Sequence, residues 1–357
     1  MTKDTSAGDG VNQAAHAAAP NVDFQAEKAV VRELYDDLSR ATVETVADTL
    51  ARHTSKDWHW RGVYPFYERH GATDTAHAFW EPFLSAFSRV QRRQDIFFAG
   101  QNCVGEGVWV VSTGHLMGLF DHVWLGIRPT RRITMLRYCE FNRVEGGRIV
   151  ETMLHLDIPH LMVQAGQNPF GPQTAANLVQ PGPATHDGLL FDAQPASEGV
   201  ATLAAINAMI TDLGTWSLGL PLEEELARTW HDDMLWWGPT GIGATYTIER
   251  YAKQHSGPFR AAFYDRSRTG HVARVAEGTY GGFFGWPNFT AKHRGGFMGL
   301  PANDTDAEFR VIDIYRREGE KLAENWIFID LLHWLVQQGD DVLARSAAIS
   351  GTDYSAP

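Results

Sequence analysis

The sequence has 357 residues, is 44% hydrophobic and 21% charged, and is long enough for two ordinary hydrophobic cores. Its net charge of −12, without any basic tract, argues against nucleic acid or an anionic membrane as the main partner. The two cysteines, Cys103 and Cys139, are too few for a disulfide framework or a zinc cluster, so we expect a reducing, cytoplasmic location.

The first element in chain order is a polar tail. Residues 1–22 are small and polar and lack the apolar centre of a signal peptide, which predicts disorder. Apolar residues then recur at helical spacing from Glu27 to Arg52, which predicts a helix. No apolar run approaches the roughly 18 residues that a membrane span requires.

The chain contains the same pattern twice. Leu50, Trp60 and Gly62 recur 176 positions later, and residues 141–166 match residues 314–339 with a shift of 173. We therefore predict two tandem domains, at 23–166 and 198–345. A Pro- and Gly-rich linker at 167–197 joins them, and a tail at 346–357 follows.

Each copy reads as helices first and strands after. In the second copy the helical pattern runs from Val200 to Trp230, and the later half of each copy alternates like half-buried strands. Turns at Glu145-Gly146-Gly147 and Glu318-Gly319 predict a hairpin between the last two strands of each copy. The fold class is therefore α+β, with a curved antiparallel sheet in each domain.

The last strand of each copy mixes acids with large apolar residues on one face. By period-2 geometry this face carries Ile149, Glu151, Met153, His155 and Asp157 in the first copy, and Leu322, Glu324, Trp326, Phe328 and Asp330 in the second. Such a face suits a pocket wall, where a desolvated acid exchanges protons near neutral pH. The alternative is that Asp157 and Asp330 cap the helices that follow them.

Histidines and tryptophans supply further candidates. His155 lies two residues from Asp157 on the same face, which predicts a proton-relay pair, and His115 and His293 occupy matching strand positions. Trp60 and Trp236 are predicted to line the pockets. No pair of histidines in the first copy has the spacing of a helical zinc site, so we predict no metal.

Several motifs of the second copy occur in the order found in one known family. EGEKLAENWIFIDLLHWLVQQG, AAFYDR at 261–266, AKHRGGFMGLPAN at 291–303 and WWGP at 236–239 resemble the SnoaL-like polyketide cyclases of the nuclear transport factor 2-like superfamily. The first copy departs from the pattern, with Met153 in place of the tryptophan and GHLMGLF at 114–120.

The resemblance implies a fold and a chemistry. It implies a strongly bent sheet closed by helices into a cone-shaped pocket. It also implies cofactor-free aldol-type chemistry by a pocket aspartate, here Asp330 and Asp157, with His and aromatic residues nearby. Single domains of this superfamily pair through the outer face of the sheet, so we predict an intramolecular pseudo-dimer, which could pair again as a homodimer.

The expected function is therefore an acid/base enzyme of cyclase, isomerase or lyase type. Its substrate would be a small, largely apolar carbonyl compound, aromatic or polyketide-like. Two alternatives stay open at this point. One is a binding or carrier protein without catalysis. The other is an epoxide-hydrolase-like hydrolase that uses pocket carboxylates.

Overall fold

The computed structural model describes residues 21–215 and 218–357. Most of the predicted disordered tail therefore lies outside the described residues. Its last two residues do not fit that prediction, because Asn21–Val22 form strand β1, which pairs antiparallel with β8 (Gln194–Pro195). None of the described helices is long and apolar enough to cross a membrane.

The first copy forms a six-stranded sheet with the order β3-β2-β7-β6-β5-β4. Its strands are β2 (Thr54–Gly62), β3 (Tyr67–His70), β4 (Phe87–Gln101), β5 (Val108–Phe120), β6 (Ile133–Glu145) and β7 (Arg148–Leu156). Its helices are α1 (Gln25–Leu38), α2 (Val46–His53), α3 (Gly71–Thr75), α4 (Glu81–Ala86) and α5 (Ile158–Gln164). A π-helical turn at Ala76–Trp80 joins α3 to α4.

The second copy repeats this sheet with the order β10-β9-β17-β16-β13-β12. Its strands are β9 (Trp230–Trp237), β10 (Ala244–Tyr246), β12 (Ala273–Glu277), β13 (Tyr280–Phe284), β16 (Val311–Glu318) and β17 (Lys321–Ile329). Three further strands, β11 (Phe263–Arg268), β14 (Phe289–His293) and β15 (Asn303–Phe309), form a separate small sheet. The long strands of the first copy are thus divided in the second.

The second sheet has its own set of helices, as the first does. They are α6 (Ala196–Thr215), α7 (Leu222–Leu226), α8 (Ile248–Tyr251), α9 (Gly257–Ala262), α10 (Leu331–Gln337) and α11 (Val342–Ser350). A π-helical turn at Ala252–Ser256 and a 3-10 turn at Phe297–Gly299 complete the set among the described residues. The predicted α+β class is confirmed, and both predicted hairpins form.

Three predictions about the elements need correction. The sheets are mixed rather than antiparallel, because β2 runs parallel to β7 and β9 runs parallel to β17. Each of these first strands enters directly from the amino-terminal helices, and a long crossover separates it from its parallel neighbour. The predicted helix from Glu27 to Arg52 is two helices, α1 and α2. The predicted tail at 346–357 begins inside α11.

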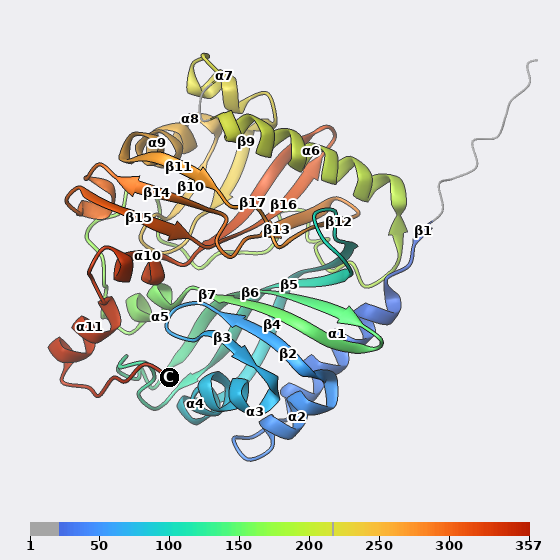
Figure 1. Ribbon diagram of the computed structural model, residues 1–357, viewed down its shortest axis with the longest axis vertical. Helices are drawn as coiled ribbons and strands as arrows, with labels where there is room; N and C mark the ends of the chain where they lie inside the picture. Colours follow the sequence, from blue (N-terminus) through green and yellow to red (C-terminus); the bar gives the residue numbers. More distant parts are fainter. Residues whose placement is uncertain (1–20, 216–217) are drawn as a thin grey trace, which may run out of the picture.

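The two sheets pack against each other face to face (Figure 1). The cluster between them contains Trp109, Phe141 and Met153 from the first copy, and Phe284, Trp326 and Phe328 from the second. The rings of Phe141 and Phe284 have their centres 5.1 Å apart. This packing through the outer sheet faces is the arrangement that the predicted pseudo-dimer requires.

Polar contacts reinforce this contact between the domains. The guanidinium of Arg137 lies 3.8 Å from the centre of the Phe328 ring and donates to the Ile327 carbonyl at 3.0 Å. Lys28 on α1 forms a buried ion pair of 2.6 Å with Glu277 on β12. The carboxyl-terminal segment crosses back to the first domain (Figure 1), where the hydroxyls of Tyr354 and Tyr64 lie 3.2 Å apart. Both domains are therefore held in one unit.

Candidate active site in the second domain

The last-strand residues that sequence analysis assigned to a pocket wall lie elsewhere. Met153, Trp326 and Phe328 belong to the cluster between the sheets. Glu151 accepts hydrogen bonds from Arg61 at 2.9 Å and Arg143 at 2.8 Å, and Glu324 accepts from Arg316 at 2.8 Å. Met153, Trp326 and Phe328 thus lie on the outer face of their sheets, and they are buried because the other domain covers that face. Ile149 and Leu322, at the start of these strands, belong to the other core cluster.

Asp157 and Asp330 cap helices, and each also holds the other domain. One carboxylate oxygen of Asp157 accepts from the His160 amide at 3.0 Å, and the second accepts from the Thr240 amide of the second domain at 3.0 Å. Asp330 accepts from the His333 amide at 3.2 Å and from the Tyr64 amide of the first domain at 2.9 Å. These contacts support the helix-cap alternative and place both acids outside the cavity described below.

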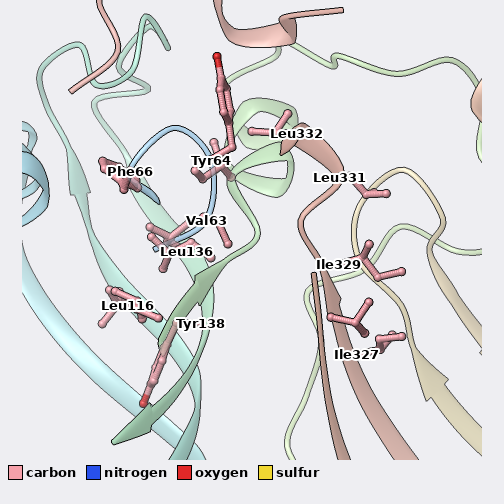
Figure 2. Packing of buried hydrophobic residues seen from close by; sticks show 14 of the residues in the cluster. Val63, Tyr64, Phe66, Leu116, Leu136, Tyr138, Ile327, Ile329, Leu331 and Leu332 are labelled. Atoms are coloured by element: carbon pink, nitrogen blue, oxygen red, sulfur yellow. The ribbon is translucent and has the colours of Figure 1, made fainter. Parts of the chain in front are cut away.

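The loop that carries Tyr64 and the start of α10 lie side by side at this junction (Figure 2). In the same view, Ile327 and Ile329 project from β17 on the side away from Val63 and Leu136 of the first domain. That side of β17 is the interior of the second domain, and the cavity lies there.

The predicted histidines do not gather at one site. His155 lies between the sheets with its ring centre 5.6 Å from that of Phe328, and neither of its ring nitrogens has a hydrogen-bond partner. The predicted relay to Asp157 is therefore not formed. Burial, together with the charge of Arg137, lowers the pKa of His155 to about 3. His115 Nδ1 lies 3.4 Å from Asp95, and His293 Nδ1 lies 3.2 Å from the Pro301 carbonyl.

The two predicted tryptophans occupy equivalent interior positions. Trp60 stacks on Phe79 in the core of the first domain, with ring centres 5.7 Å apart. Trp236 lines a cavity in the second domain. A Cβ on Gly238 would lie 2.1 Å from the Trp236 ring, so only glycine lets the indole fold across the strand here.

The cavity in the second domain has a volume of about 140 Å³ and a mostly apolar wall that is rich in aromatic residues. Its aromatic lining comes from Trp230, Trp236, Tyr251, Phe259, Phe289, Phe309 and Tyr315. Its polar lining includes Asp313, Asn325, His255, Arg260 and Arg266. An apolar cavity with a few convergent polar groups is the usual form of a small-molecule site.

Asp313 is the buried acid of this cavity. It lies in the middle of β16 between Ile312 and Ile314, and the Asn325 amide donates to its carboxylate at 3.1 Å. The Tyr315 hydroxyl also donates to it. Burial outweighs these two hydrogen bonds and raises the pKa of Asp313 to about 7. The carboxyl group is therefore poised to gain or lose a proton at neutral pH.

His255 provides a second polar group in the cavity wall. Its ring stacks on Trp236 with centres 4.1 Å apart, and its Nδ1 has no hydrogen-bond partner. Burial lowers the pKa of His255 to about 3, so the imidazole is neutral at physiological pH. A neutral imidazole can donate one hydrogen bond to an oxygen that develops negative charge.

The same position in the first domain carries a neutralised acid. Glu140 pairs with Leu154 across β6 and β7, as Asp313 pairs with Ile327 across β16 and β17, so the two acids are equivalent by register. Glu140 forms a buried ion pair of 2.6 Å with Arg92, whose guanidinium lies over the Tyr35 ring. Phe79 replaces His255 at the repeat shift of 176 and fills the core.

Comparison with known proteins identifies the stretch that carries this wall. Residues 284–338 match the family described as SnoaL-like polyketide cyclase. The match includes Asp313 and Asn325 and confirms the resemblance seen in the sequence. A search of curated proteins found no match.

Each of the following solved structures matches about two fifths of this chain. AclR from Streptomyces galilaeus is 19% identical over 42% of this chain and 87% of its own, with a TM-score of 0.35. IdmH from Streptomyces antibioticus is 18% identical over 39% and 99%, with a TM-score of 0.32. An NTF2-like protein from Burkholderia xenovorans is 14% identical over 42% and 97%, with a TM-score of 0.30. The fold observed in this chain is two six-stranded mixed sheets with helices.

Sequence analysis missed Asp313 and His255, although the sequence carries a signal for the first. Asp313 interrupts the run Val311-Ile312-Asp313-Ile314-Tyr315, and a lone acid amid apolar residues of a strand is costly to bury without a purpose. Glu140, in Cys139-Glu140-Phe141, gives the same signal in the first copy. His255 lies on a π-helical turn and has no comparable pattern.

One group in the described residues has the composition of a metal site. His59, Glu68 and His70, on β2 and β3, place one ligand atom each within 4.8 Å of the others. His59 Nε2 lies 2.9 Å from Glu68, which also accepts from the Trp286 indole at 2.8 Å. This group lies at the edge of the first sheet and does not line the cavity of the second domain.

Proposed function

We propose that the second domain is a cofactor-independent acid/base catalyst for a small, largely apolar carbonyl compound, with Asp313 as the proton-transferring group. The observation that carries this proposal is the buried carboxyl of Asp313, with a pKa near 7, in an aromatic cavity. The SnoaL-like sequence of this stretch supports a cyclase, isomerase or lyase reaction.

The ionised carboxylate of Asp313 takes a proton from the carbon next to the substrate carbonyl. The electron pair of the broken C–H bond moves into the carbonyl system and gives an enolate, whose oxygen needs a hydrogen-bond donor. His255, Tyr251 and Arg260 are donors in the cavity wall. Asp313 then returns its proton: to another carbon of the enolate in an isomerisation, to the alkoxide that forms when the enolate carbon attacks a second carbonyl in a cyclisation, or to the leaving group that departs with its electron pair in an elimination.

The first domain has a different role in this proposal. Its equivalent acid is held as an ion pair by Arg92, so it is not available to accept a proton from a substrate. We propose that the first domain supports the second, since it covers the outer face of the second sheet and the loop before α10.

Proton exchange tests the proposal without knowledge of the natural product. A panel of phenolic and polycyclic ketones would be incubated with the protein in D₂O, and loss of the α-proton signal would be followed by NMR. Asp313→Asn should slow the exchange by about 100-fold or more, because it removes the base and keeps the shape. The panel compounds should still bind.

The matched control is Glu140→Gln in the first domain, which removes the equivalent acid. Exchange that survives in Asp313→Asn but is lost in Glu140→Gln would place the chemistry in the first domain and contradict the proposal. Binding of panel compounds with no exchange by the wild-type protein would favour a carrier protein. Hydrolysis of an epoxide that depends on Asp313 would favour the hydrolase alternative.

A further inference from the structure

We propose that the substrate of the second domain carries a carboxylate, which binds in a second cavity that Asp313 also lines. This inference rests on the proposed function and names the substrate class of the same site. It comes from the arrangement of arginine side chains beside the aromatic cavity.

The second cavity has a volume of about 170 Å³ and shares part of its wall with the first. Both cavities are lined by Leu213, Arg266, Phe289, Val311 and Asp313. A ligand whose apolar part fills the first cavity and extends into the second would therefore contact Asp313.

The second cavity is rich in positive charge. Arg266, Arg268, Arg274 and His271 line it, and Asp313 is the one acid among its lining residues. Burial and the charges of Arg268 and Arg260 lower the pKa of Arg266 to about 10, as expected where cations repel one another. A protein with a net charge of −12 keeps this group of cations around one cavity.

Neutral groups hold these arginines in place. Arg274 donates to Asn207 at 2.6 Å and to His271 Nδ1 at 3.0 Å, and Arg268 donates to the Ile210 carbonyl at 2.8 Å. Neither Arg268 nor Arg274 forms an ion pair with a carboxylate in the described part of the chain. Both guanidinium groups are thus positioned but keep their full charge.

In the first domain, the arginine equivalent to Arg268 has a structural role. Arg268 pairs with Phe289 across β11 and β14, as Arg92 pairs with Leu116 across β4 and β5. The two residues of each pair are separated from their counterparts by the repeat shifts of 176 and 173, so Arg268 and Arg92 are equivalent. Arg92 neutralises Glu140. Asp313 is one methylene shorter than Glu140, and no arginine contributes to its pKa. The charge of Arg268 is therefore left for a ligand.

A neutral histidine completes the cavity. The ring of His271 stacks on Phe283 with centres 4.0 Å apart, and burial beside Arg274 and Arg268 lowers the pKa of His271 to about 3. His271 accepts from Arg274 through Nδ1, so its Nε2 carries the hydrogen and can donate. Because planar guanidinium groups match the two oxygens of a carboxylate, we assign a carboxylate as the ligand group of this cavity.

Calorimetry with matched probes tests the proposal. 3-Acetylbenzoate and acetophenone share the ketone and the ring and differ in the carboxylate. The wild-type protein should bind 3-acetylbenzoate about tenfold more tightly, and 0.5 M NaCl should reduce this preference. Arg274→Gln, at a half-buried position, should remove most of the preference, and Arg268→Gln, at the exposed mouth, should remove less.

Arg250→Gln is the matched control, because Arg250 is exposed on α8 and lines neither cavity. It should leave the preference unchanged, and thermal melting should show that all variants are folded. Equal affinity for the two probes, or a preference that survives in Arg268→Gln/Arg274→Gln, would overturn the proposal. Tighter binding of phenyl phosphate than of 3-acetylbenzoate would overturn the assignment to a carboxylate.

The two proposals fail in different experiments. Asp313→Asn should keep the preference for 3-acetylbenzoate, because the arginines remain, while it loses proton exchange. A lost preference with intact Asp313-dependent exchange would refute only the anion site. An intact preference with no exchange in any protein would refute only the catalysis.

Discussion

The two domains have an acid at equivalent positions of equivalent strands, but the groups around the two acids differ. In the first domain Glu140 is neutralised by Arg92 at 2.6 Å, and aromatic side chains fill the surrounding core. In the second domain Asp313 receives hydrogen bonds from neutral donors, and the space in front of it is open. The difference shows that the fold tolerates the acid and that its partners decide whether the position is structural or reactive.

The largest effect on stability should come from the first domain. Arg92→Met leaves the buried Glu140 without its cation, and removal of one partner of a buried ion pair costs about 3–5 kcal/mol. Urea denaturation at pH 8 measures the change. Arg92→Met/Glu140→Leu should recover much of the loss. If Arg92→Met has the stability of the wild type, the acid of the first domain is not held by this pair.

The stability of the second domain should depend on pH through Asp313. The pKa of Asp313 is raised from 3.8 to about 7, so its protonated form stabilises the fold below pH 4, and that stability is lost as the pH rises to 7. Asp313→Asn cannot ionise. Its stability relative to the wild type should therefore increase between pH 4 and pH 8, by up to about 4 kcal/mol.

The histidines with lowered pKa act in the other direction. Wild-type stability falls below pH 6.5 because the unfolded chain binds protons that His155, His255 and His271 do not take up in the fold. Because these groups are present in both proteins, the difference between Asp313→Asn and the wild type isolates Asp313. A difference that does not change with pH would contradict the account of this site.

A smaller effect distinguishes the helix caps from the catalytic acid. Asp157→Ala and Asp330→Ala each remove a cap and a hydrogen bond to the other domain, and each should cost about 2 kcal/mol. Proton exchange should persist in both variants under conditions where they are folded. Loss of exchange in folded Asp330→Ala, with Asp330→Asn restoring stability but not exchange, would return the chemistry to the residue first chosen from the sequence.

The sequence was sufficient for the repeat, the α+β class, the hairpins and the family resemblance, because each rests on local patterns. It was not sufficient for the direction of the side chains on β17. Every residue of this strand from Leu322 to Ile329 is buried, since one face lines the domain interior and the other contacts the first sheet. Alternation therefore could not tell Trp326, at the interface, from Ile327, at the cavity.

The local sequence was also not sufficient to assign a role to Asp157 and Asp330. Asp157 and Asp330 stand where a strand ends and a helix begins, and there a cap and a pocket acid have the same local sequence. The amides that decide the matter, Thr240 and Tyr64, come from the other domain, far away in the chain. Contacts of that range follow from the packing of the two sheets and not from either repeat alone.

A ¹³C NMR titration of the side-chain carboxyl groups tests the central claim most directly. With Asp313→Asn and Glu140→Gln used to assign the two signals, the carboxyl of Asp313 should titrate near pH 7. A midpoint for Asp313 at or below about pH 4, the ordinary range of an exposed aspartate, would contradict the claim that the second domain holds a reactive acid.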